Sequence, residues 1–190
     1  MIKAILMLAL SVSNSDPGIT PQKVCAIQNA IRFGQAAWTE EQCQEVAAAF
    51  AATKDPVQSV AIAINESDLR PVVMANPKPG VFDVGLMGVR CVVVRGRCVN
   101  GHAKGYTLAQ LQNPVINISV ASKVLEGKRS ELGQDFLRGY NGGSTEHGYA
   151  AKIAVLAAAI DGRQLKAKGK RIRELVGKIV RAVTAGKATS

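Results

Sequence analysis

Glu66 is the residue whose type and setting best suit chemistry. It stands shortly after the apolar run 60–64, in the last turn of a predicted helix. Ile62 and Ala63, one turn earlier, disfavour the ionised carboxylate in a closed site, and the negative end of the helix dipole acts in the same direction. Both effects predict a carboxyl group that can serve as a general acid at a glycosidic oxygen. Taken alone, such a residue is more often an ordinary exposed glutamate.

The helix that positions Glu66 has clear start and stop signals. Asp55 is a good N-cap, Pro56 suits the first helical position, and Gln58 completes a capping box. Pro71 disfavours helical backbone at the residue before it, so the helix is expected to end near 67–69. The chemistry therefore sits where a helix runs into a loop.

Other segments surround this helix. Hydrophobic spacing and capping residues predict further helices, whereas residues 71–106 are rich in Gly, Pro and Val and predict loops with a short β-hairpin. The expected fold is mainly α. The expected helices start at Thr20 and Thr39 and cover 107–111, 114–127, 130–138, 149–160 and part of 163–190.

Four segments carry a family resemblance. They are AIAINESDLRP around Glu66, Phe82–Met87 with its Gly-Leu-Met, Asn113–Ile118, and Gly139–Gly143 followed by Gly148-Tyr149. In order and spacing, from about residue 38 to residue 160, they resemble the lytic transglycosylase family of the lysozyme superfamily. The Asp-x-Gly-Leu-Met form is similar to small members associated with type IV secretion systems and with phages.

The resemblance implies a fold, a substrate and a reaction. The fold would be lysozyme-like α+β with a small β-hairpin lobe. The substrate would be peptidoglycan, cut between N-acetylmuramic acid and N-acetylglucosamine. Glu66 would protonate the leaving oxygen and then, as a base, help the muramic acid C6 hydroxyl form a 1,6-anhydro product. One carboxylate then suffices, whereas ordinary glycosidases need two.

The same resemblance implies further site residues. Tyr140 would lie near the cleavage site and Met87 would line the cleft floor, although without the resemblance both suit ordinary packing. Gly88 stands where the family usually has Gln, which removes a side chain expected to bind substrate or support the acid. The substrate-binding residues implied are Ser67, Gly85, Leu86, Met87, Asn117, Tyr140, Asn141, Gly142 and Tyr149.

Two alternatives share this fold. If Asp68 or Asp83 faced Glu66 across a cleft, a lysozyme-type hydrolysis would become possible. The change at Gly88 also allows a non-catalytic wall-binding module or virion component. No cofactor or metal is expected, because the histidines, His102 and His147, are isolated and the cysteines lack metal-ligand spacing.

The four cysteines form two candidate disulfides. Cys91 and Cys98 flank a predicted hairpin turn near Gly96, and Cys25 and Cys43 lie on consecutive predicted helices. Buried free thiols are the alternative.

Charge is concentrated near the C-terminus. The formal net charge is +10, and residues 161–190 hold nine basic residues against two acidic ones. Residues 170–183 predict a basic amphipathic helix. The nearly balanced body and the few aromatic residues argue against a nucleic-acid-binding protein. The basic segment is interpreted as a contact to an anionic wall polymer, a membrane surface, or a secretion or virion partner.

The chain divides into three predicted parts. Residues 1–19 hold a lysine, a short apolar run and small residues, which could form a signal peptide or a buried first element. Residues 20–162 would form the transglycosylase domain and 163–190 the tail. These features favour a periplasmic or exported protein, with a phage virion as the alternative.

Overall fold

The computed structural model describes residues 18–32, 34–140, 148–163 and 169–187. Nearly all of the predicted signal segment, together with Asn141 and Gly142, therefore lies outside the described residues. Within them the fold is mainly helical with one small antiparallel sheet, as expected. The main elements are α1 (Pro21–Ile31), α2 (Glu40–Ala51), α3 (Pro56–Ser67), β1 (Val73–Ala75), β2 (Val81–Val84), β3 (Val89–Val94), β4 (Arg97–Cys98), α4 (Leu108–Gln112), α5 (Pro114–Leu132), α6 (Phe136–Tyr140), α7 (Tyr149–Ile160) and α8 (Lys170–Lys187).

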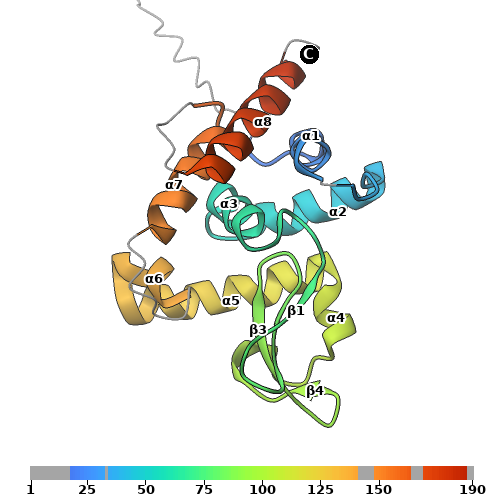
Figure 1. Ribbon diagram of the computed structural model, residues 1–190, viewed down its shortest axis with the longest axis vertical. Coiled ribbons are helices and arrows are strands. Elements are labelled where there is room, and N and C mark those ends of the chain that lie inside the picture. Colours follow the sequence, from blue (N-terminus) through green and yellow to red (C-terminus); the bar gives the residue numbers. More distant parts are fainter. Residues whose placement is uncertain (1–17, 33, 141–147, 164–168, 188–190) are drawn as a thin grey trace, which may run out of the picture.

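The elements form a helical part and a smaller β lobe. In Figure 1, α1, α2, α3, α7 and α8 lie together in the upper part, and the strands and α5 lie below them. α3 packs against α7, while α1 packs against both α2 and α8. α3, which carries Glu66 in its last turn, is buried over Ser59–Ile64 and supports Glu66 from within the helical part.

Helix starts follow the capping chemistry in the sequence. The side chains of Thr20, Thr39, Asp55 and Thr107 each accept a hydrogen bond from the third backbone N–H of their helices. At Thr39 and Thr107 a glutamine completes the capping box by accepting from the cap residue's own N–H. Satisfying these donors fixes where α1, α2, α3 and α4 begin.

The β lobe is larger than the predicted hairpin. Four antiparallel strands lie in the order β1-β2-β3-β4, and β2 pairs Asp83 with Arg90 of β3. The predicted hairpin is the β3–β4 pair, whose turn holds Arg95 and Gly96, both with positive φ. β1 and β2 were not foreseen, because each is short and lies among Pro and Gly residues.

α5 is one continuous helix where the sequence predicted two. It runs without a break from Pro114 to Leu132 and ends at Gly133, where φ is 55°. Arg129 contributes to its persistence, because its guanidinium donates to Gln58 Oε1 at 2.6 Å and stacks on the ring of Phe136. Residues predicted as a second helix instead form a short 3₁₀ turn and α6.

α8 is part of the packed core and not a separate tail. Its apolar face is buried against α1 and α7. Membrane binding through that face is therefore not supported, and only the basic face remains available for a contact outside the protein. The buried residues of α8 are Ile172, Leu175, Val176, Ile179 and Val183.

Two disulfides link neighbouring elements. One joins Cys25 of α1 to Cys43 of α2, and the other joins Cys91 of β3 to Cys98 of β4. These are the pairs expected from the sequence, and the alternative of free thiols does not hold. Each bond restrains the unfolded chain over a short loop. Among the helices that the structure describes, none is long and apolar enough to span a bilayer.

Candidate active site

Glu66 occupies the last turn of α3 at the junction between the helical part and the β lobe. Its side chain is half-buried. The phenol of Tyr149, at the start of α7, donates a 2.6 Å hydrogen bond to Glu66 Oε1, and the amide of Asn65 lies 3.4 Å from the same oxygen. The carboxyl group is therefore held from one side while Oε2 lies toward Gly88 of the β lobe.

The environment raises the pKa of Glu66 above its usual value. Burial is the main cause, because it penalises the charged form, and the negative charge of Asp83 acts in the same direction. The hydrogen bonds from Tyr149 and Asn65 and the charge of Arg90 lower the pKa but do not outweigh burial. The direction is the one that the apolar sequence around Glu66 predicted.

Gly88 brings the backbone of the β lobe against Glu66. It has φ 63°, and a Cβ at this position would lie 3.0 Å from Glu66 Oε2 and 3.4 Å from Glu66 Cβ. A side chain here would have to displace the carboxyl group or the loop. In this chain the close approach of Glu66 therefore favours glycine at residue 88, where the family usually has Gln.

Asn117 of α5 holds the loop that leads to Gly88. Its amide nitrogen donates to the carbonyl oxygens of Val84 at 2.8 Å and Leu111 at 3.0 Å, and its Oδ1 accepts from the N–H of Met87 at 2.8 Å. Gly85 passes so close to the Asn117 amide that a Cβ would overlap it. Asn117 is fully buried, and its amide nitrogen already donates to these two carbonyl oxygens. Its side chain therefore holds the loop and has no donor left for a sugar.

Ser67 ties the end of α3 to the same loop. Its hydroxyl lies 2.7 Å from the carbonyl oxygen of Leu86, to which it donates, and it accepts from the N–H of Arg70 at 3.1 Å. Helix α3 and the loop are thereby joined at the residue next to Glu66.

Tyr140, at the end of α6, completes the support. Its hydroxyl donates to the carbonyl oxygen of Met87 at 2.5 Å, next to Gly88. Burial and the charges of Glu66 and Asp83 raise the pKa of this phenol, so it stays protonated and remains a donor. Burial, followed by the charge and hydrogen bond of Glu66 and by Tyr140, raises the pKa of Tyr149.

The structure thus brings together most of the residues singled out in the sequence, and several of them are buried. Ser67, Leu86, Met87 and Asn117 are closed to solvent, so in this conformation they support the site and their side chains do not face a substrate. Tyr149, expected to bind substrate, is also buried and holds Glu66 instead. Gly85 serves the close approach to Asn117.

Asp68 and Asp83, the two candidates for a second catalytic carboxylate, lie in different settings. Asp68 is buried and paired with Arg171 of α8, so it is not available as a partner of Glu66 in catalysis. Asp83 lies on the β lobe and is paired with Arg90, whose Nε is 3.0 Å from Asp83 Oδ1. Both members of this pair act electrostatically on Glu66. Arg90 was missed from the sequence, where only the alternation of β3 could have indicated that it lies opposite Asp83.

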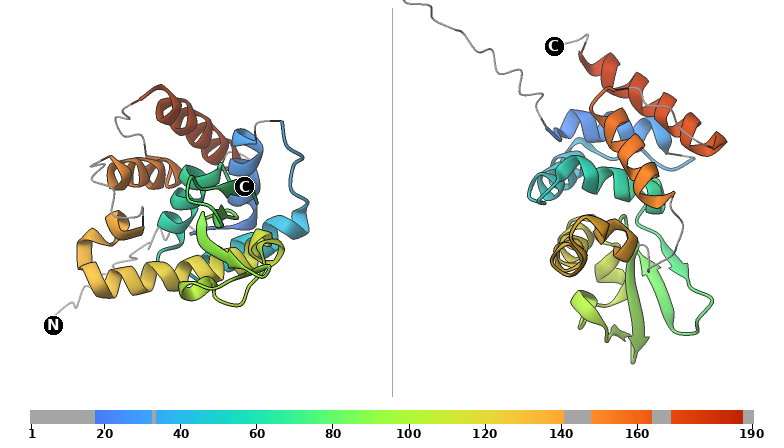
Figure 2. Two further views of the ribbon diagram at one scale, coloured as in Figure 1. Left: turned by 60° about the horizontal axis from the view of Figure 1, so that its bottom comes forward. Right: turned by 90° about the vertical axis from the view of Figure 1, so that its left-hand side faces the viewer.

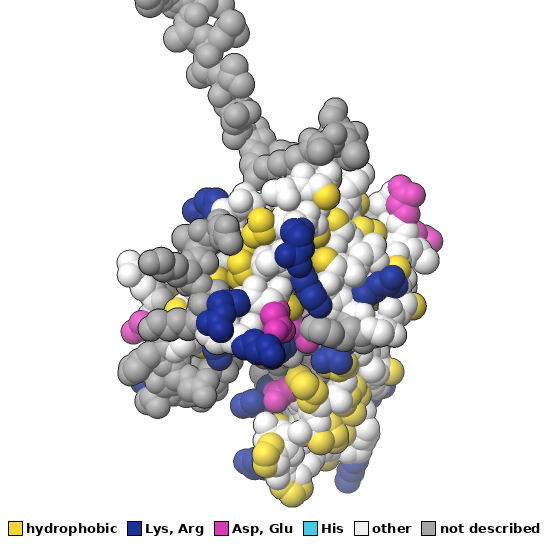
Figure 3. Space-filling model, turned by 45° about the horizontal axis from the view of Figure 1, so that its top comes forward, with side chains coloured by type: hydrophobic (Ala, Val, Ile, Leu, Met, Phe, Trp, Pro, Cys, Tyr) yellow, Lys and Arg dark blue, Asp and Glu magenta, His cyan; other side chains and the backbone are white. Residues whose placement is uncertain are grey.

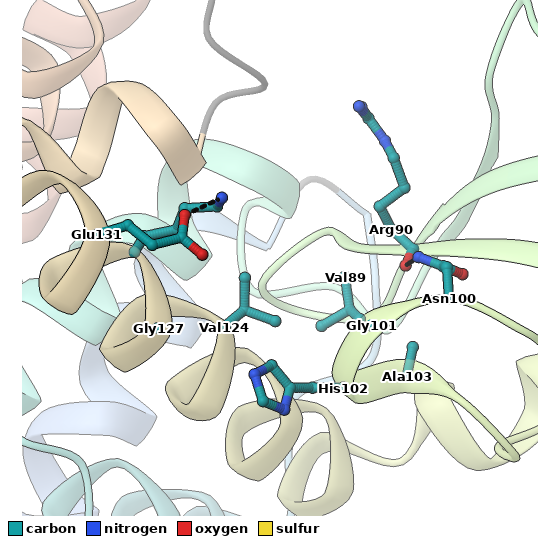
Figure 4. A pocket seen from close by; sticks show the side chains of 10 residues that line it. Val89, Arg90, Asn100, Gly101, His102, Ala103, Val124, Gly127 and Glu131 are labelled. Atoms are coloured by element: carbon teal, nitrogen blue, oxygen red, sulfur yellow. Dashed lines mark hydrogen bonds and ion pairs between the residues drawn. The ribbon is translucent and has the colours of Figure 1, made fainter.

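A pocket of about 300 Å³ lies between the β lobe and α5, and neither Glu66 nor Tyr149 is among its lining residues. In Figure 4, Val89 and Val124 of the lining lie between Arg90 on one side and Glu131 on the other. Because Val89 and Arg90 directly follow Gly88, the pocket begins within two residues of the contact with Glu66. Its lining residues are Val89, Arg90, Asn100, Gly101, His102, Ala103, Val124, Gly127, Lys128 and Glu131.

Comparison with known families decides the membership. The model of the transglycosylase SLT domain family matches residues 45–155, more than half of the chain. The chain belongs to the transglycosylase SLT domain family. The matched SLT region contains Glu66, the loop held by Asn117, Tyr140 and Tyr149, whereas α1 and α8 lie outside it. Neither the search of curated proteins nor that of solved structures found a match.

Membership in the SLT family gives the chain a general function. It is a lytic-transglycosylase-type domain that acts on peptidoglycan, which implies a location outside the cytoplasm. The two disulfides fit an oxidising compartment. A metal centre has no support in the part of the chain that the structure describes, where no three His, Cys, Asp or Glu side chains gather.

Proposed function

We propose that this SLT-domain protein cleaves the glycan strands of peptidoglycan by lytic transglycosylation, with Glu66 as the general acid and then the general base. The observation that carries the proposal is the setting of Glu66, whose burial raises its pKa while Tyr149 fixes its position. A carboxyl group that is protonated before the reaction and fixed in place has the properties that a general acid needs.

The first step transfers a proton from Glu66 to the glycosidic oxygen between N-acetylmuramic acid and N-acetylglucosamine. Tyr149 and Asn65 both address Oε1, so we assign the proton to Oε2. As the C1–O bond breaks, N-acetylglucosamine leaves with this proton. The resulting carboxylate is stabilised by the Tyr149 hydrogen bond, which is stronger to a charged acceptor than to a neutral one.

The second step closes the muramic acid on itself. The Glu66 carboxylate takes the proton of the C6 hydroxyl as O6 attacks C1, which forms the 1,6-anhydro product and returns Glu66 to its protonated state. No water enters the product. This reaction needs no second carboxylate, which agrees with the pairing of Asp68 with Arg171.

The pocket lined by Val89 and Arg90, the two residues after Gly88, is our candidate for a glycan subsite. It combines an apolar floor with the charged side chains of Arg90, Lys128 and Glu131 at its margins. A sugar presents both apolar faces and hydroxyl groups, and such a lining suits it. We therefore assign this pocket to the part of the glycan strand that lies on the β-lobe side of the scissile bond.

Hydrolysis is the second candidate, because the charge of Asp83 acts on Glu66. If Asp83 activated a water molecule, the product would have a reducing end instead of an anhydro end. Digestion of purified sacculi followed by mass spectrometry separates the two reactions. Anhydro-ended muropeptides support transglycosylation, whereas reducing-end products alone would assign the protein to hydrolysis.

A wall-binding module without activity is the third candidate, motivated by Gly88. It predicts that folded protein binds sacculi but releases nothing from them. The matched test compares the wild type with Glu66→Gln, and equal binding with no soluble product from either protein would support the binding module.

A periplasmic enzyme and a phage virion component would both act on this substrate, and we propose the periplasmic or exported setting.

The basic face of α8 is our proposed contact to anionic wall polymers or another envelope partner. Figure 3 shows Lys and Arg side chains in several separate places on one face of the molecule, with Asp and Glu among them. Arg173 and Arg181 of α8 are exposed. Because the apolar face of α8 is buried in the core, deletion of 163–190 would unfold the protein and cannot test the contact.

Charge reversal at Arg173 and Arg181 tests the contact instead. It should weaken sacculus binding in low salt and leave the melting temperature nearly unchanged. Unchanged binding by a folded double variant would refute the contact.

A further inference from the structure

The turn that follows Glu66 has an unusual backbone. Asp68 and Leu69, neither of them glycine, both have left-handed conformations, with φ 54° and 57°. Their N–H groups bond back to the carbonyl oxygens of Ile64 at 3.0 Å and Ala63 at 3.4 Å. These bonds span the helical turn that contains Glu66, so the position of its carboxyl group depends on a turn that is costly for side chains of this kind.

The carboxylate of Asp68 is held in place by a residue from the other end of the chain. Arg171 of α8 places its Nη2 3.0 Å from Oδ1 and 3.1 Å from Oδ2 of Asp68, and Arg70 lies farther away at 3.8 Å. The Asp68 side chain is 8% exposed and that of Arg171 is 62% exposed. The guanidinium therefore covers a carboxylate that is otherwise nearly enclosed. Removal of the cation would leave a buried charge without its main partner.

The same helix supports the other attachment of Glu66. α8 packs against α7, whose first residue is Tyr149, the donor to Glu66 Oε1. Figure 2 shows α8 beside α7 and close to α1 at the end of the molecule opposite the β lobe. Both structures that hold Glu66, the left-handed turn and Tyr149, thus rest on a helix outside the matched residues 45–155.

We propose that Arg171 is a positioning residue for Glu66, acting through its ion pair with Asp68. Arg171 does not touch the reacting atoms. It keeps the left-handed turn at 68–69 closed, and this turn keeps Glu66 aimed at the glycosidic oxygen. The kinetic consequence of this proposal rests on the proposed function. Its structural consequence, a turn that opens when the ion pair is removed, is independent of that function.

The test uses variants that remove the charge with little change in shape. Arg171→Met keeps the aliphatic stem, and Asp68→Asn keeps a residue that tolerates the left-handed conformation. With soluble glycan-chain substrate, each should lower kcat about 10-fold at nearly constant KM, because a small misplacement of a catalytic group costs rate more than binding. Arg171→Lys should recover part of the loss, and the double variant should be no slower than either single one.

Arg163→Met is the matched control, because Arg163 also pairs with an aspartate, Asp161, but on the exposed surface. It should retain the kcat of the wild type. A general loss of α8 packing, unlike loss of the ion pair, would not be rescued by Lys. Wild-type kcat in both Arg171→Met and Asp68→Asn, or an equal loss in Arg163→Met, would overturn the proposal.

Hydrogen exchange provides a readout that needs no activity. Amides 68 and 69 should exchange faster in Arg171→Met than in the wild type, while amides of α5 should not. Unchanged protection at 68 and 69 would also overturn the proposal. If Glu66→Gln were as active as the wild type, the proposed function would fail, whereas the exchange result would still decide whether Arg171 holds the turn.

Discussion

The Tyr149 hydroxyl donates a 2.6 Å hydrogen bond to Glu66 Oε1 across a separation of 83 residues. This bond joins the last turn of α3 to the first turn of α7 and lies in a largely buried setting. It restrains the carboxyl group and stabilises its ionised form, while burial favours the protonated form. Glu66 can therefore change protonation state during a reaction without losing its position.

Replacement of Tyr149 by Phe tests this relationship. The hydrogen bond lowers the pKa of Glu66, so its loss should raise that pKa further. Because a general acid is lost as pH rises through its pKa, the alkaline fall of kcat/KM should move to higher pH. The rate at the optimum should fall about 10-fold because orientation is lost.

The measurement for Tyr149→Phe is a pH–rate profile on soluble glycan chains. Tyr106→Phe is the matched control, since Tyr106 lies in the β lobe and should leave the profile unchanged. A downward shift of the alkaline limb in Tyr149→Phe would contradict the proposed role.

Gly88→Ala should separate activity from stability. The new Cβ would lie 3.0 Å from Glu66 Oε2, and the alanine would also have to adopt an unfavourable positive φ. The backbone strain should cost about 1 kcal/mol, and the contact should lower kcat at least 10-fold by displacing the carboxyl group.

Gly96→Ala is the control for Gly88→Ala. Gly96 also has positive φ, but a Cβ there would meet nothing within 4 Å. It should lose similar stability in urea unfolding and keep its activity. Equal kcat values in the two variants would show that Gly88 does not bring the backbone against the reacting group.

Asn117→Ala should destabilise the protein through the loop before Gly88. It removes three hydrogen bonds and leaves the N–H of Met87 and two carbonyl groups without their buried partner. The expected loss is about 2–4 kcal/mol of unfolding free energy. Asn76→Ala, which removes one exposed hydrogen bond, should cost less than about 1 kcal/mol. Urea unfolding checks both, and similar costs would contradict the clamp.

The raised pKa of Glu66 also predicts a pH-dependent stability. An acid whose pKa is higher in the folded protein than its ordinary value of 4.5 binds more protons when folded. Its contribution then falls as pH rises from about the ordinary value through the folded value. Glu66→Gln should therefore melt higher than the wild type at pH 8, and the gap should narrow toward pH 4. A gap that widens at low pH would contradict the raised pKa.

Several elements could be predicted because their determinants are local. Asp55 and Thr39 accept from N–H groups three residues later, so the starts of α3 and α2 are encoded in adjacent residues. Cys91 and Cys98 lie on either side of a hairpin turn, so their disulfide could be predicted from the sequence. The importance of Glu66 came from a local pattern together with the family resemblance.

The remaining features depend on contacts between distant residues. The bond from Tyr149 to Glu66 and the pair of Arg171 with Asp68 arise only when α7 and α8 pack. The burial of Met87 follows from Asn117 closing the loop around it. An amphipathic helix such as α8 has the same sequence pattern whether its apolar face meets a membrane or a protein core, so its packing on α1 could not be inferred.

The most direct test of the central claim is the product analysis of sacculi digested by the wild type and by Glu66→Gln. Both proteins should be folded, as checked by circular dichroism and thermal unfolding. The account predicts anhydro-ended muropeptides from the wild type and at least a 10³-fold loss with Glu66→Gln, because no other group supplies the proton. Anhydro products formed at the wild-type rate by Glu66→Gln, or only reducing-end products from the wild type, would contradict it.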